Sequence, residues 1–310
     1  MADTVLAAPG PAAGASGGPA AVPAPGPPPA PAPARPPRGP ERPILQAVGV
    51  GLLLLAVLVL GLAGYLYFLS GVQEARSQAL LYTRLQNELA NQVAPLGPTA
   101  PGSPVAVVAI PAIGIRDMVV VQGTSPENMM LGPGHLRVTP MPGQAGVSEI
   151  FGRRATFGAP FARLGELRPG DVIVAVTGQG RSVYRVAAVG SSQAVRIVDP
   201  APNRLLLVTA ASPVVPSYYI EIDARLVSVT RPGPPVVHVL NAPELALAGD
   251  DGALVLTFIW GIALAAVSAV GTYGALRWNL WAAYLAAVPL AIAVLWCLYQ
   301  SLAALLPNLY

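Results

Sequence analysis

Long apolar runs divide this chain into segments. Residues 44–70, 254–272 and 280–306 are almost wholly apolar. A stretch of about 20 apolar residues is long enough to cross a lipid bilayer as a helix. The pattern therefore predicts three transmembrane helices, the last two joined by a short loop, residues 273–279.

The region between the first and second apolar runs has a different pattern, typical of β-structure. Residues 104–230 contain short Val-rich runs bounded by Gly and Pro, which indicate strands. Many short strands in about 130 residues favour a β-barrel or a sandwich. In the run 219–226 apolar and polar residues alternate, which predicts one buried and one solvent-facing side. The alternating residues are Ile220, Ile222, Ala224 and Leu226 on one side and Glu221, Asp223 and Arg225 on the other.

Residues 71–103 begin as a continuation of the first helix and end in a Pro-rich linker. Apolar side chains recur every fourth residue, at Leu81, Leu85, Leu89 and Val93, which indicates one apolar face of a helix. This face would bind a partner in a stalk, or it would pack on the chain's own β domain. The spacing is compatible with both interpretations.

The remaining segments are a tail and a second linker. Residues 1–43 consist mainly of Ala, Pro and Gly and cannot bury enough apolar surface to fold, so they are expected to be disordered. Residues 231–253 form a Pro-containing linker. Arg35, Arg38 and Arg42 precede the first apolar run, and Arg277 lies in the loop 273–279. The positive-inside rule then places the N-terminal tail and this loop in the cytoplasm and the β domain outside the bacterial membrane.

Composition agrees with a multi-pass membrane protein. Hydrophobic residues make up 54% of the chain and charged residues only 11%, with a net charge of +3. The scattered Arg residues form no nucleic-acid-binding face. The single cysteine, Cys297, lies in an apolar run and cannot form an intrachain disulfide. No metal-ligand spacing or phosphate-binding loop is present, so neither a metal nor a cofactor is expected.

Several short motifs in the β region occur in a characteristic order. They are Ile110-Pro-Ala-Ile-Gly-Ile115, Leu131-Gly-Pro-Gly-His-Leu136, Thr139-Pro-Met-Pro-Gly143 with Gly146, Phe157-Gly-Ala-Pro-Phe-Ala-Arg-Leu164 and Leu167-Arg-Pro-Gly-Asp171. In this order and spacing, residues 104–230 resemble a sortase of the class E or class C type, a transpeptidase that joins proteins to the bacterial cell wall. The resemblance implies a sortase-like β-barrel outside the membrane.

The resemblance also assigns positions to the family's catalytic groups, and different residues occupy them here. Sortases use a Cys nucleophile, a His that transfers protons and an Arg that stabilises the oxyanion. The His position is Arg153, in Glu149-Ile-Phe-Gly-Arg-Arg154. The Cys position is Ala210, after Thr209, and the Arg position falls near Tyr218 and Tyr219. An Arg stays protonated and cannot transfer protons at ordinary pH.

From these substitutions we expect a degenerate sortase that is not an enzyme and that works by binding. It would be a binding or scaffolding subunit of a cell-envelope complex in the cytoplasmic membrane. Its partners would be membrane or envelope proteins, lipid and a second copy of itself, but not nucleic acid. The former substrate groove would be lined by Arg153, Arg154, Ala210 and Tyr218, with the two Arg either attracting an anion or facing solvent.

An enzymatic alternative also remains open. Ser212 is a candidate nucleophile and His135 a candidate base, so the chain would then be a divergent transpeptidase or hydrolase. In the sortase pattern His135 belongs to a structural turn. His238 lies in the linker and has no better claim to such a role.

Overall fold

The computed structural model describes residues 42–192, 203–212, 218–236, 239–277 and 280–310. The predicted tail therefore lies outside the described residues, apart from its last two positions. His238, Arg35 and Arg38 also lie outside them.

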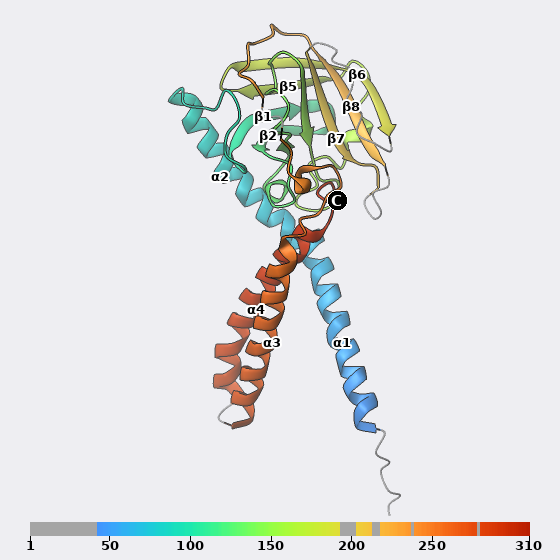
Figure 1. Ribbon diagram of the computed structural model, residues 1–310, viewed down its shortest axis with the longest axis vertical. Helices are drawn as coiled ribbons and strands as arrows, with labels where there is room; N and C mark the ends of the chain where they lie inside the picture. The colour runs from blue at the N-terminus through green and yellow to red at the C-terminus, as the bar shows by residue number, and fades with distance from the viewer. Residues whose placement is uncertain (1–41, 193–202, 213–217, 237–238, 278–279) are drawn as a thin grey trace, which may run out of the picture. The chain divides into compact units, whose positions relative to one another are not determined.

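Eight strands form a closed barrel in the order β1-β2-β3-β4-β7-β8-β6-β5 (Figure 1). This confirms the predicted barrel. Val, Ile and Leu dominate most of these strands and favour pleated, half-buried surfaces. The strands are β1 Pro104–Ile110, β2 Ile115–Gln122, β3 Gly134–His135, β4 Val147–Phe151, β5 Val172–Thr177, β6 Gly180–Ser192, β7 Arg204–Ala210 and β8 Tyr219–Leu226.

Strand β7 lies between β4 and β8. It pairs in parallel with β4, with Phe151 opposite Val208. It pairs antiparallel with β8, with Ala210 opposite Tyr219. The end of β4, the end of β7 and the start of β8 therefore meet at one place on the barrel.

The alternation of side chains along β7 separates two apolar clusters. Leu205 and Leu207 belong to the barrel core, together with Ile150, Ile222 and Ala224. The intervening residues of β7 belong to another cluster on the outer face of the barrel. That outer cluster contains Met129, Leu136, Phe151, Leu206, Val208, Ala210, Tyr219 and Leu309.

The side chains on the outer face of β8 are less exposed to solvent than the sequence predicts. Ile222 and Ala224 face the core as expected, but Glu221 is only 9% exposed. The prediction of one fully solvent-facing side is therefore wrong at Glu221. Alternation alone does not reveal that other segments of the chain cover this side of the strand.

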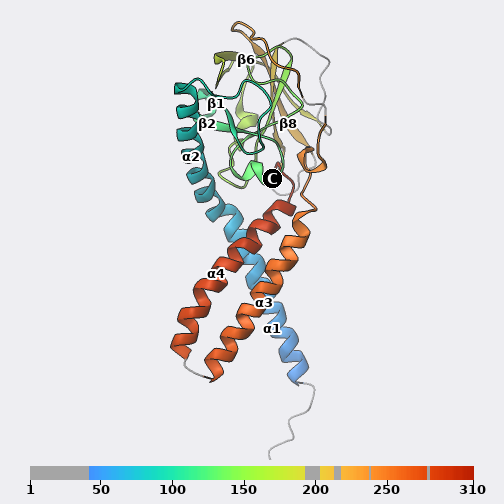
Figure 2. The same cartoon turned by 60° about the vertical axis from the view of Figure 1, so that its left-hand side comes forward.

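The described residues also include three long apolar helices. They are α1 Arg42–Gly64, which continues through a π-helix at Tyr65–Leu69, then α3 Ala253–Arg277 and α4 Leu280–Leu305. Each is long and apolar enough to cross a membrane. Helices α3 and α4 lie side by side in both views (Figure 1 and Figure 2).

Helix α2, Ser70–Ala90, packs on the barrel. The Gln78 side chain donates to the Val119 and Leu131 carbonyls at 3.0 and 2.8 Å, and the Val119 N–H donates back to it at 2.8 Å. Leu85 is fully buried. At Leu85 the apolar face of the helix therefore packs on the chain's own domain. This side chain is not available to a partner.

The other members of this face are less buried. Leu81 and Leu89 are half-buried, and Val93 is 69% exposed and lies beyond the end of α2. The helix stops at Ala90, before the expected Pro-rich end. The four positions therefore do not form one continuous surface for a partner.

Candidate functional site

The positions that the sequence assigned to the site do come together. The Gly152 N–H donates to the Val208 carbonyl at 3.0 Å. The Thr209 hydroxyl donates to the Gly152 carbonyl at 2.8 Å. These bonds, with the pairing of Ala210 and Tyr219, bring the chain after β4 to the ends of β7 and β8.

Arg153 is fully buried and serves as an internal hydrogen-bond donor. Its Nε donates to the Met129 carbonyl at 3.2 Å, and Nη2 donates to the Pro126 carbonyl at 3.0 Å. Its Nη1 donates to the Thr156 hydroxyl at 3.2 Å, and the guanidinium carbon lies 4.8 Å from the centre of the Phe157 ring. These contacts satisfy a buried charge, which would otherwise be costly.

The expected roles of Arg153 are therefore wrong. The side chain does not face solvent, and each of its guanidinium nitrogens already donates to an acceptor within the protein. Burial lowers its pKa to about 9, an effect partly opposed by the Tyr65 hydroxyl. At neutral pH the guanidinium is charged, and its described contacts hold together the loops around the site.

The other members of the site differ in exposure. Arg154 is half-buried, and Thr209 and Ala210 are fully buried. Tyr219 is 8% exposed, whereas its neighbour Tyr218 is 48% exposed. Of these positions, Tyr218 presents the largest surface to solvent.

A segment that sequence reasoning missed covers the site. Leu309, just beyond α4, is fully buried in the outer cluster with Ala210. Its carbonyl accepts the Arg154 N–H at 3.1 Å, and the Tyr310 carbonyl accepts the Thr156 hydroxyl at 2.9 Å. No local pattern predicts this contact, because the segment is far from β7 in the chain.

Asn308 anchors that segment. Its side-chain amide donates to the Thr124 and Leu245 carbonyls at 2.7 and 2.9 Å, and its Oδ1 accepts the Leu247 N–H at 2.9 Å. The side chain is fully buried. A buried amide with three partners holds its backbone in one place.

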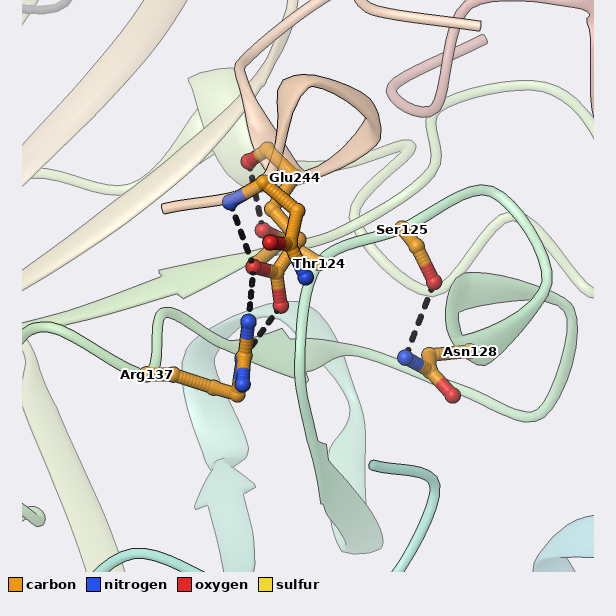
Figure 3. A network of polar contacts seen from close by, with 6 residues as sticks. Thr124, Ser125, Asn128, Arg137 and Glu244 are labelled. Carbon is orange, nitrogen blue, oxygen red and sulfur yellow. Dashed lines mark hydrogen bonds and ion pairs between the residues drawn. The ribbon is translucent and has the colours of Figure 1, made fainter. Parts of the chain in front are cut away.

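Glu244 anchors the linker on the same side of the barrel. Figure 3 shows its carboxylate facing the Arg137 guanidinium, which donates to it through Nε at 2.5 Å and through Nη2. The Thr124 hydroxyl donates to the Glu244 carbonyl at 2.6 Å, and the side chain also caps its own short helix, Ala242–Glu244. Thr124 thus binds both the linker and the segment after α4.

Two acidic residues are buried near this covered face. Glu149 on β4 and Glu221 on β8 are 7% and 9% exposed. Burial raises the pKa of Glu149 to about 7, and the neighbouring charge of Glu221 raises it further. The Glu149 carboxyl group therefore titrates near neutrality, because burial disfavours its charged form.

The residues of the enzymatic alternative lie in different environments. His135 is buried, with Nε2 3.0 Å from the Pro140 carbonyl and Nδ1 3.2 Å from Gln122 Oε1. Burial lowers its pKa to about 4, so it is neutral at pH 7 and fixed by structural contacts. Ser212 is half-buried and lies just past the end of β7.

Comparison with protein families identifies the barrel. Residues 108–232 match the model of the sortase domain. Over these residues, which are less than half of the chain, the barrel is similar to sortases. A search of curated proteins finds no match.

Solved sortases resemble the domain. A Clostridium perfringens sortase D5 transpeptidase is 18% identical, with a TM-score of 0.44, and the match covers 49% of this chain and 99% of that one. Sortase E of Streptomyces avermitilis is 29% identical, with a TM-score of 0.38, and the match covers 42% and 91%. Sortase C1 of Streptococcus agalactiae is 19% identical, with a TM-score of 0.38, and the match covers 52% and 93%.

The match to the sortase domain corrects one expectation. The prediction that this protein is not an enzyme is contradicted, because its barrel matches the domain of an enzyme family. The residues at positions 153 and 210 show only that the side chains expected for sortase chemistry are replaced there. Loss of activity does not follow from these replacements.

Proposed function

We propose that this protein is a membrane-anchored member of the sortase family that holds a peptide segment of another envelope protein at the ends of β4, β7 and β8. In this role it is a binding subunit of a bacterial cell-envelope complex. The observation that carries the proposal is the outer cluster around Ala210, which already holds the apolar side chain of Leu309 from a turn near the end of the chain itself.

The chemistry of the surrounding residues supports binding. The Leu309 side chain packs into the outer cluster, while main-chain groups of the same segment bond to Arg154 and Thr156. An apolar side chain held in a pocket and a backbone held by hydrogen bonds are how proteins recognise extended peptides. Tyr218 adds an exposed aromatic ring, a residue type enriched in interfaces.

The membrane topology in this proposal is the one predicted from the charges. The tail before α1 and the loop between α3 and α4 lie in the cytoplasm, and the sortase domain lies outside. Three apolar helices support the membrane association. Partners of this protein are then membrane or envelope proteins, including a second copy of the chain.

The test is recovery of the intact protein from native membranes in mild detergent, with mass spectrometry of its partners. Tyr218→Ala should lower the recovery of a stoichiometric partner, because it removes the exposed ring at the site. Val229→Ala is the matched control, since Val229 is 79% exposed and lies outside the site. Return of the protein without a partner, or equal recovery from both variants, would count against the proposal.

Membership of a transpeptidase family favours a second candidate function, peptide-bond transfer with Ser212 as nucleophile. The Ser212 hydroxyl would attack a peptide carbonyl, release an amine and pass the acyl group to a second amine. Incubating the full chain with sorting-signal peptides and an amine nucleophile tests this directly. Turnover that disappears in Ser212→Ala supports it, and turnover that persists in Ser212→Ala excludes Ser212 as the nucleophile.

A further inference from the structure

The outer face of β4, β7 and β8 is covered by two segments distant from it in the sequence. One is the linker residues 240–248, whose Leu240, Ala246 and Leu247 pack against the outer cluster. The other is residues 307–310, whose Leu309 belongs to that cluster. Together we call residues 240–248 and 307–310 the plug.

The two parts of the plug hold each other. The Asn308 N–H donates to the Ala248 carbonyl at 3.0 Å. The Asn308 side chain bonds to Leu245 and Leu247 in the linker and to Thr124 on the barrel. The plug is therefore a single hydrogen-bonded unit attached to the barrel.

The plug is continuous with the helix pair α3–α4. The linker part lies just before α3, and residues 307–310 follow directly after α4. The Asp250 N–H donates to the Ala304 carbonyl at 2.9 Å, which joins the two helix ends. A movement of either helix end would thus be transmitted to the plug.

The covered surface is where the proposed function places the partner's peptide. Ala210, the position assigned to the sortase nucleophile, is fully buried, and Tyr219 opposite it on β8 is only 8% exposed. A partner's peptide and Leu309 cannot occupy the same cluster at the same time. Binding of one therefore requires displacement of the other.

We propose that the plug is an intramolecular occupant of the peptide-binding face and that its release, through the ends of α3 and α4, opens that face to an apolar peptide. This inference rests on the proposed function for the identity of the incoming ligand. Covering of Ala210 by the plug is an independent property of the chain. An experiment can therefore refute the covering by the plug without refuting the binding of a partner's peptide, and the reverse.

Thiol labelling measures the covering directly. The chain has one cysteine, so a Cys297→Ala background permits a single reporter at Ala210→Cys. In the full chain in detergent this thiol should react slowly with a maleimide. In a chain that stops after Leu306, or in one carrying Asn308→Ala with Leu309→Ala, it should react at least about tenfold faster, because local opening exposes it.

Two further reporters separate plug release from unfolding. Leu207→Cys faces the barrel core and is fully buried, so it should stay protected in every variant. Ala162→Cys is exposed and should react equally fast in all of them. If Ala210→Cys gains no more reactivity than Leu207→Cys when the plug is removed, the inference is overturned.

A synthetic peptide with the sequence of residues 304–310 tests whether the face accepts a peptide. Added to the shortened chain, it should restore the slow labelling of Ala210→Cys. The same peptide with Asn308→Ala and Leu309→Ala should not restore it. Failure of rescue, despite fast labelling of the shortened chain, would refute peptide acceptance and leave the covering by the plug established.

Partner recovery distinguishes the inference from the proposed function. The shortened chain should retain more of the partner than the full chain does, because its face is open. Fast labelling of Ala210→Cys in the shortened chain, with no partner recovered with either chain, would support the plug and count against the proposed binding role. Slow labelling of Ala210→Cys in the shortened chain, with a partner that is lost in Tyr218→Ala, would support the binding role and overturn the plug.

Discussion

The two faces of strand β7 are equally dry for different reasons. Leu205 and Leu207 are buried because the barrel closes around them. Leu206, Val208 and Ala210 are buried because segments from outside the barrel cover them. The inner face is shielded from solvent because the sheet closes on itself. The outer face is shielded because those segments pack on it.

This difference separates what keeps the barrel folded from what covers its outer face. A closed barrel shields its interior with no help from the rest of the chain. A surface covered by a separate segment can be exposed by local opening, at less than the free energy of global unfolding. The comparison leads to four predictions, in order of decreasing effect.

Truncation on the inner face should have the largest effect. Leu207→Ala should lower the free energy of unfolding by about 2–5 kcal/mol, because it leaves a cavity in a closed core. Urea denaturation of the full chain in detergent measures this loss, and cleavage of the barrel by a protease reports its unfolding. Val229→Ala, on an exposed side chain, should change stability by no more than about 0.5 kcal/mol. Equal losses in the two variants would contradict the assignment of Leu207 to the core.

The outer face should show a pH dependence. Burial raises the pKa of Glu149 to about 7 from 4.5, so between these values the folded protein binds more protons than the unfolded chain. Stability is therefore lost as pH rises through this window, by at most about 3 kcal/mol. In Glu149→Gln that loss should disappear.

Denaturation of both proteins between pH 5 and pH 8 measures the difference. His135 acts in the opposite direction, because its pKa of about 4 lies below 6.5 and stability is lost as pH falls between these values. This contribution is the same in both proteins and cancels. If the stability of the wild type and that of Glu149→Gln depend on pH in the same way, Glu149 is not shielded and the outer face is open to water.

The plug should couple energetically to the outer face of β7 and not to the inner face. Leu206→Ala combined with Leu309→Ala should depart from additivity by about 0.5–3 kcal/mol, because both side chains belong to one cluster. Leu207→Ala combined with Leu309→Ala should be additive within about 0.5 kcal/mol. The same denaturation assay completes both cycles. Equal coupling in both cycles would remove the distinction between the faces.

The smallest loss of stability is expected for an ion pair on α2, away from both faces of β7. Arg84 and Glu88 form an exposed ion pair on α2 at 2.8 Å. Arg84→Ala should cost about 0.5 kcal/mol or less, because solvent screens such pairs. High salt should remove even this difference. A larger loss would mean that α2 contributes to the barrel through this pair as well as through Gln78 and Leu85.

Local pattern was sufficient for most of the architecture. Alternation at Ile222 and Ala224 and the Val-rich runs indicated the barrel, and the length of the apolar runs indicated the three helices. In the structure Gly152 bonds to Val208 and Thr209, and Ala210 pairs with Tyr219. The environment of Arg153 was not foreseen, because its acceptors are the carbonyls of Pro126 and Met129, which no side-chain pattern identifies.

By itself, the sequence indicated which segments are strands and which are long apolar helices, because those depend on periodicity and length within a few neighbouring residues. Only the tertiary structure decided which faces are wet. Ala210 is covered because Leu309 and the linker pack there, from far along the chain. Burial depends on contacts between distant segments, and those contacts leave no mark on local periodicity.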